Sequence, residues 1–318
     1  MNLLDNQNIN FIIGEHHSFS KKRPRGGHMM LHLLAYKLAE RGNNVYIFAD
    51  PMYPHENIHK IPQDYWEDPD PDSNIARWAY ESFFYPLHKT VSIYPCDYIG
   101  NTFGTVHNVR WVLDQINPDT EETWHVDDVY FRCAWEHYSY PWENAKKLAP
   151  ILSVMDYKFD DFYDEKLERK GFCYLPWKYT PENAKDIISE FDPFVIDRFQ
   201  SDDGSFGGHN YLRKVFNEYE YMLTFDNKFF LTVAAGLCGC KTILLESPLS
   251  WDYQKKLSPI EYRLNNSLNM FGVAYGIDDI KWADQTIGLV KDYQKEHEKF
   301  SEQTVDRFVE FWKDRLKM

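Results

Sequence analysis

The sequence contains no long apolar run. No stretch approaches the roughly 20 consecutive apolar residues that a helix needs to cross a bilayer. The amino-terminal segment MNLLDNQN also lacks the basic and apolar regions of a secretory signal peptide. These two absences argue against an integral membrane protein, and we expect a cytoplasmic protein for which only peripheral membrane contact is left open.

Positive charge is scarce as well. The 318 residues include 35 Lys and Arg against 49 Asp and Glu, which gives a formal net charge of −14. Nucleic-acid binding requires clustered cations to neutralise phosphates, so we expect no nucleic-acid partner. The length is sufficient for two domains of ordinary size, each with its own core.

Cysteine is rare and follows no pairing pattern. The five residues are an odd number scattered along the chain, at Cys96, Cys133, Cys173, Cys238 and Cys240. Such usage predicts reduced thiols and no disulfide framework. A Cys-x-Cys pair could begin a zinc site, but no second Cys or His pair stands at zinc spacing, so buried small side chains are expected at Cys238 and Cys240.

A metal-binding acidic motif is also not expected. Asp68, Asp70 and Asp72 in the segment IPQDYWEDPDPDS (61–73) are similar to the D-x-D of one large glycosyltransferase class. Prolines separate these acids and no apolar strand flanks them, which favours an exposed loop. We therefore expect no metal and no cofactor.

The most informative stretch runs from Tyr221 to Pro248. It reads as a strand over 221–225, an acidic turn at Asp226 and Asn227, a small-residue helix over 229–237 that ends at Gly239, and a strand over 241–245. Open α/β sheets bind ligands at the carboxyl ends of their strands, where this turn lies. The small helix residues would allow a backbone or a flat ligand to approach closely.

A second unit of this kind opens the chain. A strand over 10–13 and a polar loop precede RGGHMMLHLLAYKLAERGNNVYIFAD, in which apolar residues recur at helical spacing until Gly42 ends the helix and 45–49 form a strand. Gly26 and Gly27 then lie at a helix amino end, where free N–H groups and the helix dipole favour an anion such as phosphate.

Five segments in order resemble a bacterial and viral group of GT-B glycosyltransferases. They are GGHMMLHLLAYKLAERGNNVYIF, VSIYPCDYIGNTFGTVHNVRWVLDQ, RKGFCYLPWK, TFDNKFFLTVAAGLCGCKTIL and FGVAYGIDDIKWADQT. The resemblance implies an α/β fold with two Rossmann-like domains that face each other across a cleft. We expect an acceptor-side domain over 1–160, a donor domain over 161–300, and a terminal helix over 301–318 that packs back toward the first domain.

The resemblance also implies a donor site. Asp226 matches the first of two glutamates, eight residues apart, that many retaining GT-B enzymes carry, whereas Ala234 occupies the second position. Lys178 matches the basic residue that such enzymes place on the diphosphate. The expected donor-binding residues are Gly26, Gly27, Lys178, Asp226, Asn227 and Glu246, although Asp226 could also serve only as a helix cap.

Two further roles are assigned from residue chemistry. A base for the acceptor hydroxyl is expected at His28, with His16, His17 and Glu15 left open, and Asp226 is the second catalytic candidate. Trp135 and Tyr138 belong to the aromatic cluster FRCAWEHYSYPWE, whose rings could stack on an acceptor sugar. Core filling is the alternative role for these aromatics.

The expected activity is therefore transfer of a sugar from a nucleotide-sugar donor to a glycan, surface-polysaccharide or lipid-linked saccharide acceptor. A nucleotide-sugar epimerase can share this two-domain fold. A degenerate sugar-binding module is the third alternative, because Ala234 replaces an acidic residue. The sequence leaves open the donor, the acceptor, the stereochemistry and the oligomeric state.

Overall fold

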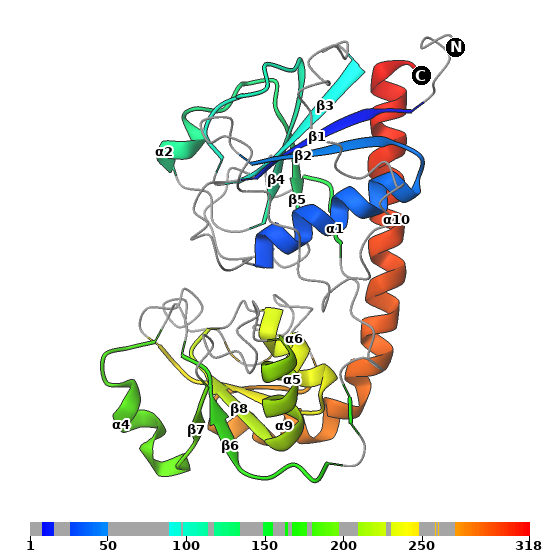
Figure 1. Cartoon of the computed structure of the whole chain (residues 1–318). Coiled ribbons are helices and arrows are strands. Elements are labelled where there is room, and N and C mark those ends of the chain that lie inside the picture. The colour runs from blue at the N-terminus through cyan, green and yellow to red at the C-terminus, as the bar shows by residue number, and fades with distance from the viewer. Residues whose placement is uncertain are drawn as a thin grey trace. The chain divides into compact units, whose positions relative to one another are not determined.

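The computed structural model divides into two compact units (Figure 1). The first consists mainly of Met1–Glu136, Tyr140–Asp156 and Glu298–Met318, and the second mainly of Tyr157–His297. The structure describes residues 8–15, 26–49, 89–96, 98–113, 118–133, 149–154, 163–164, 167–176, 180–196, 209–226, 230–247, 258, 260 and 271–318, with the side chains at 15, 26–29, 48–49, 118, 120, 209–210 and 230 left aside.

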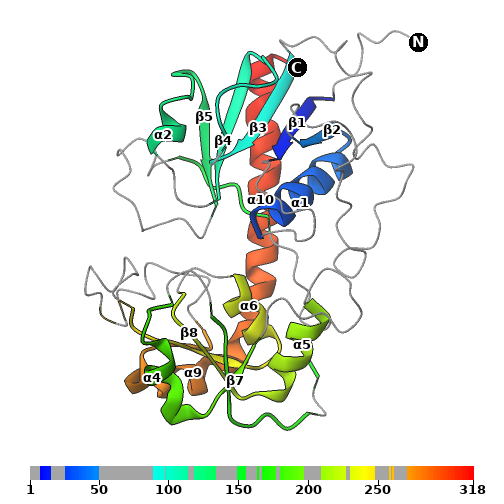
Figure 2. The same ribbon diagram turned by 60° about the vertical axis from the view of Figure 1, so that its left-hand side comes forward.

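The first unit contains a five-stranded sheet in the order β2-β1-β3-β4-β5, and all of its strand pairs are parallel (Figure 2). Its elements are β1 (Asn10–Glu15), α1 (Gly26–Glu40), β2 (Asn44–Ala49), β3 (Thr90–Pro95), β4 (His107–Val112), α2 (Pro118–Glu121) and β5 (Val129–Arg132), together with the carboxyl-terminal part of α10 (Val290–Leu316).

One face of this sheet forms the main apolar core. Side chains alternate along a strand, so Phe11 and Ile13 of β1 share a face with every second residue of β3 and β4. Helices α1 and α10 cover that face with a stripe of apolar residues each: Leu31, Leu34, Ala35 and Leu38 from α1, and Val305, Phe308, Val309 and Trp312 from α10. The terminal helix is thus part of the first core.

Polar contacts join α1 to α10 at the edge of this core. Arg41 donates to the carboxylates of Glu302 and Asp306, each at 2.7 Å, and Lys37 forms an ion pair with Glu302. Helix α1 ends where the sequence predicts, because Gly42 adopts a φ of 79° that favours glycine and its N–H donates to the carbonyl of Ala39.

The second unit contains another parallel five-stranded sheet, in the order β10-β9-β8-β6-β7. Its elements are β6 (Phe172–Tyr174), α4 (Ala184–Ile188), β7 (Phe194–Val195), α5 (His209–Glu218), β8 (Tyr221–Thr224), α6 (Phe230–Leu237), β9 (Lys241–Leu244), β10 (Val273–Tyr275), α9 (Ile280–Thr286) and the amino-terminal part of α10, with 3-10 turns η5 (Ser189–Phe191), η7 (Ile277–Asp279) and η8 (Ile287–Leu289).

The predicted fold class is confirmed as α/β, with two separate parallel sheets of the Rossmann-like type. In each unit the described strands follow the doubly wound order 2-1-3-4-5, counted along the chain. The strand–helix–strand reading of the most informative stretch is confirmed as β8, α6 and β9, with ends within one residue of those predicted. Gly239 follows α6 with a φ of 81°.

Two expected absences can be compared with the described residues. None of the helices in the described part of the chain is long and apolar enough to span a membrane. All five cysteines are buried and none forms a disulfide. Burial, reinforced by the neighbouring Cys240, raises the pKa of the Cys238 thiol to about 12, so this side chain stays a neutral, small apolar group.

Candidate functional site

The strand order of the second sheet places a switch point between β6 and β8. From β6 the chain continues to its neighbour β7 on one side, whereas from β8 it continues to β9 and β10 on the other. In open parallel sheets such a reversal leaves a crevice at the carboxyl ends of the two strands, where ligands bind. The segments that follow Tyr174 and Thr224 are therefore the candidate site of this unit.

Asp226 lies at this point. It follows the last residue of β8 by two positions, and it is 2% exposed. Its N–H donates to the hydroxyl of Thr224 at 3.2 Å, and that hydroxyl donates to the carbonyl of Leu175, just beyond β6, at 3.2 Å. The two strand ends are thus joined by hydrogen bonds around Asp226, which holds its backbone in place.

The position of Asp226 relative to α6 bears on the alternative role of a helix cap. An N-cap residue immediately precedes the first helical residue. The described part of α6 begins at Phe230, and residues 227–229, which join it to Asp226, lie outside the described residues. The role of a helix cap therefore stays the alternative for Asp226.

Glu246 lies at the same edge of the sheet, two positions after the end of β9, and it is exposed. The strand ends remain aligned here, because Leu245 donates its N–H to the carbonyl of Thr224 at 2.8 Å and Gly276 donates to Leu244 at 2.9 Å. Parallel strands therefore bring Asp226 and Glu246 to neighbouring positions on one edge.

Sequence reasoning named no residue after β10, although the same edge continues there. Asp278 in η7 is exposed, and Asp279 accepts a hydrogen bond from the N–H of Tyr275 at 2.9 Å. The signal that could have found Asp278 was its place in the segment FGVAYGIDDIKWADQT, which the resemblance includes. Asp278 thus joins Glu246 as an exposed carboxylate of the carboxyl edge.

Helix α6 uses its small residues for packing within the unit. Ala234, which occupies the position of the second glutamate in retaining GT-B enzymes, is 4% exposed and belongs to a core cluster with residues of α5 such as Leu212. A Cβ at Gly236 would lie 3.3 Å from Cγ1 of Val290 in α10. The close approach expected for a ligand at Gly236 is made instead by Val290.

In the first unit, Gly26 and Gly27 are the first described residues of α1, and residues 16–25 before them lie outside the described part of the chain. His28 lies in the same helix, and its side chain is outside the described residues. Glu15 is described only as the last residue of β1. Lys178, Asn227, Trp135 and Tyr138 also lie outside the described residues, as do His16 and His17.

The face of the first sheet opposite the apolar core carries a different arrangement. A Cβ at Gly14, near the end of β1, would lie within 3.0–3.3 Å of ring atoms of Tyr94, Tyr98 and Phe103. Only glycine allows these rings to reach the β1 backbone. Burial raises the pKa of the Tyr94 hydroxyl well above its ordinary value of about 10, so it remains protonated and donates to Asn101 at 2.8 Å.

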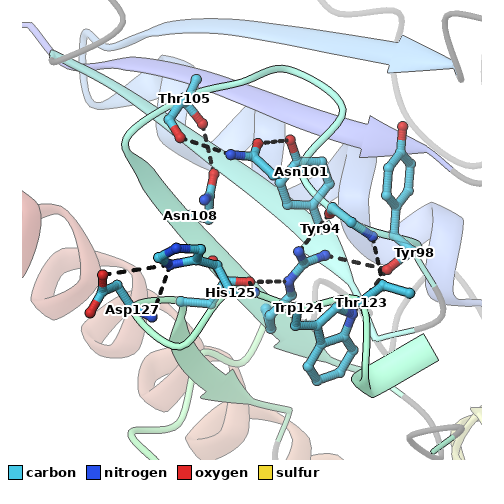
Figure 3. Close-up of polar contacts among 12 residues, drawn as sticks. Tyr94, Tyr98, Asn101, Thr105, Asn108, Thr123, Trp124, His125 and Asp127 are labelled. Carbon is cyan, nitrogen blue, oxygen red and sulfur yellow. Dashed lines mark hydrogen bonds and ion pairs between the residues drawn. The ribbon is translucent and has the colours of Figure 1, made fainter. Parts of the chain in front are cut away.

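Arg110 of β4 has a fully buried side chain, and its guanidinium lies against the ring of Tyr94, whose hydroxyl donates to Asn101 (Figure 3). Its Nε donates to Oδ2 of Asp128 at 2.7 Å, and its other nitrogens donate to the carbonyls of Tyr98 and Gly100 at 3.3 and 2.6 Å. Sequence reasoning assigned no role to Arg110. A charged residue within the apolar strand VHNVRWVL was the available signal.

In the described part of the chain, no group of three or more His, Cys, Asp and Glu side chains is arranged to hold a metal ion. A carboxylate can accept hydrogen bonds from ligand hydroxyls, which is the chemistry of sugar recognition.

Comparisons with known proteins leave the family of this chain unassigned. No protein-family model matches, and no curated protein matches. Among solved structures, the A chain of dipicolinate synthase from Bacillus subtilis aligns over 91% of this chain and 98% of its own, with 11% identity and a TM-score of 0.20. A TM-score this low carries no argument about fold or function, which here come from the chain itself.

Proposed function

We propose that this protein is a glycosyltransferase that moves a sugar from a nucleotide-sugar donor to a glycan or surface-polysaccharide acceptor. The donor binds at the carboxyl edge of the second sheet, with its sugar near Asp226 and Glu246. The observation that carries the proposal is the buried carboxylate of Asp226, directly after a central strand and beside the switch point of a parallel sheet.

The positions of the other donor residues support this proposal. Lys178 follows β6 by four positions along the chain, so the two residues assigned to diphosphate and sugar come directly after the two strands that flank the switch point. The ordered resemblance of five segments to GT-B enzymes adds to this argument. Departure of a nucleoside diphosphate develops negative charge, which a cation such as Lys178 would stabilise.

A panel of nucleotide sugars and their nucleoside diphosphates tests the binding step. A ligand that binds only the folded protein raises the melting temperature by mass action, so a donor should produce a shift that grows with its concentration. Nucleotide release that requires an added saccharide acceptor would then identify transfer. Conversion of the nucleotide sugar without acceptor would indicate an epimerase, and binding with no turnover would indicate a sugar-binding module; either result overturns the proposal.

Asp226→Asn tests the assigned residue. The change keeps an oxygen that can accept hydrogen bonds but removes the charge, so we expect a melting temperature close to that of the parent and a fall in turnover of about 100-fold. The matched control is Asp284→Asn at the opposite edge of the sheet, where the carboxylate accepts from Lys241 at 2.8 Å and Tyr221 at 2.6 Å. The control should lose stability and retain donor binding.

A further inference from the structure

The connection from β3 to β4 covers one face of the first sheet without a helix among its described residues, 98–106. Its first turn directly follows β3, because the N–H of Tyr98 donates to the carbonyl of Pro95 at 3.1 Å. The ring of Tyr94 then stacks on Phe103, with centroids 5.4 Å apart. The segment therefore starts at the carboxyl end of β3, beside β1, and returns across the sheet.

The guanidinium of Arg110 binds the first residues of the 98–106 segment. One guanidinium donates to the carbonyls of both Tyr98 and Gly100, and to the carboxylate of Asp128. The rings of Tyr94 and Trp124 lie against it, with centroids 4.7 and 5.1 Å from its central carbon. Because the guanidinium is planar and rigid, its three contacts determine where the two carbonyls lie.

A second segment, 123–128, is bound to the first one around the same guanidinium (Figure 3). The N–H of Gly100 donates to the hydroxyl of Thr123 at 2.8 Å, and the indole N–H of Trp124 donates to the carbonyl of Tyr98 at 3.0 Å. The carboxylate of Asp128 accepts from the N–H of His125 at 3.2 Å. The two segments thus share one hydrogen-bond network.

Burial of a charged pair contributes little net stability, because desolvation of the two ions offsets their attraction. Removing two ions from water costs several kcal/mol, and an apolar pair of similar volume often stabilises a core at least as well. What the Arg110–Asp128 pair provides in addition is geometry, since an apolar pair would remove the guanidinium donor to the carbonyl of Gly100 and one of the two donors to the carbonyl of Tyr98. The network therefore fixes the conformation of the segment.

The segment so fixed presents an open surface at a ligand-binding edge. In the order β2-β1-β3-β4-β5 the switch point lies between β1 and β3, and the segment begins at the end of β3. Ile99, between the two anchored carbonyls, is 61% exposed. Gly100 has a φ of 64°, and none of the atoms that the structure describes lies within 4 Å of where its Cβ would be. A ligand could approach this backbone closely.

We infer that Arg110 is a positioning residue for the saccharide acceptor: it holds Tyr98–Asn101 in the conformation in which Ile99 and Gly100 contact the acceptor sugar. The inference rests on the proposed glycosyl transfer and names the acceptor side of that reaction. Arg110 itself touches neither substrate, since its side chain is buried and bonded within the protein. Its effect on the reaction is exerted through the backbone of the anchored segment.

Arg110→Lys tests the inference through a split between the two Michaelis constants. Lysine keeps the charge but lacks the planar fork, so we expect the KM for acceptor to rise about tenfold or more while the KM for donor stays within about twofold. The probes are the nucleotide sugar with the largest thermal shift in the panel above and a set of p-nitrophenyl glycosides as acceptors. Lys241→Met, at the amino edge of the second sheet, is the control and should change neither KM.

A milder pair of variants decides the question if Arg110→Lys fails to fold. Thr123→Val removes the hydroxyl that accepts from Gly100, and Thr123→Ser keeps it. The valine variant should raise the acceptor KM about threefold or more, and the serine variant should restore it. A parent-like acceptor KM in folded Arg110→Lys, or in Thr123→Val, would overturn the inference. Absence of any transfer by the parent protein would instead overturn the proposed function, and this inference with it.

Discussion

Arg110 and Asp128 form an ion pair that solvent does not reach: Nε and Oδ2 are 2.7 Å apart, and the two side chains are 0% and 1% exposed. In such a pair, removal of one partner and replacement of both partners have unequal effects on the free energy of unfolding. Removal of one partner leaves a buried charge uncompensated, whereas replacement of both by apolar residues removes the desolvation cost as well.

The first prediction follows from this asymmetry. Asp128→Ala should lower the free energy of unfolding by about 3–5 kcal/mol, because the guanidinium of Arg110 loses its only described carboxylate partner. The double variant Arg110→Met, Asp128→Leu should be less destabilised than Asp128→Ala. Urea titrations of the parent, Asp128→Ala and the double variant measure this, and a double variant at least as destabilised as Asp128→Ala would contradict the argument.

A second prediction compares two glycines that follow helices. Gly42 and Gly239 have similar φ values of 79° and 81°. A Cβ at Gly42 would meet no described atom within 4 Å, whereas at Gly239 it would lie 3.0 Å from Tyr163 and 3.1 Å from Arg169. Gly42→Ala should cost about 1–2 kcal/mol for the backbone alone. Gly239→Ala should cost about 1–3 kcal/mol more through crowding, as measured by denaturant unfolding. Equal costs would mean that Tyr163 and Arg169 move aside freely.

The third prediction concerns pH and His297 of α10. The side chain is 7% exposed, and burial lowers its pKa from 6.5 to about 4. Below pH 6.5 the imidazole of His297 takes up a proton in the unfolded chain but stays neutral in the folded protein. The stability associated with the neutral, buried imidazole is therefore present above pH 6.5 and is lost progressively as pH falls toward 4. The loss should total about 3 kcal/mol over this window.

Comparison with His297→Phe isolates this contribution from other titrating groups. The free energy of unfolding is measured for parent and variant at pH 7 and pH 5, and the parent should lose more on acidification than the variant, which keeps a ring of similar size. A parallel loss in both proteins would show that His297 does not contribute to the acid sensitivity.

The fourth prediction concerns Glu246, which is exposed at the carboxyl edge of the second sheet. Glu246→Gln should weaken nucleotide-sugar binding by about 1.5 kcal/mol or more, since a charged acceptor of donor hydroxyls is lost. The free energy of unfolding should change by less than about 0.5 kcal/mol, as is usual for an exposed residue. Calorimetric titration of parent and variant with the donor decides it, and equal affinities would remove Glu246 from the site.

Much of the local structure was predictable from the sequence. The ends of β8, α6 and β9, and the stops at Gly42 and Gly239, were found from apolar periodicity and glycine positions. Those signals depend on residues only a few positions apart, because helix and strand propensity act locally. The position of Asp226 in a turn after β8 followed from the same reading, whereas Glu246 was assigned through the family resemblance.

Other features were decided only by contacts between distant residues. Strand order, which brings β6 beside β8 and so creates the switch point at Asp226, results from pairing across the sheet. The burial of Ala234 and the contact of Gly236 with Val290 depend on helices from other parts of the chain. No local pattern contains these partners, because packing joins residues that are far apart in sequence.

Arg110 is the clearest example of the difference between what the sequence determined and what the tertiary structure decided. Its segment, VHNVRWVLDQ, entered the sequence analysis only through the family resemblance, and its arginine was assigned no role. Its role became evident only when the fold brought Asp128, 18 residues away, and the carbonyls of Tyr98 and Gly100 to one guanidinium. The sequence by itself determined the strand–helix–strand unit of β8, α6 and β9. The tertiary structure decided what the buried charge of Arg110 binds, since a buried cation is tolerated only where the folded chain supplies its acceptors.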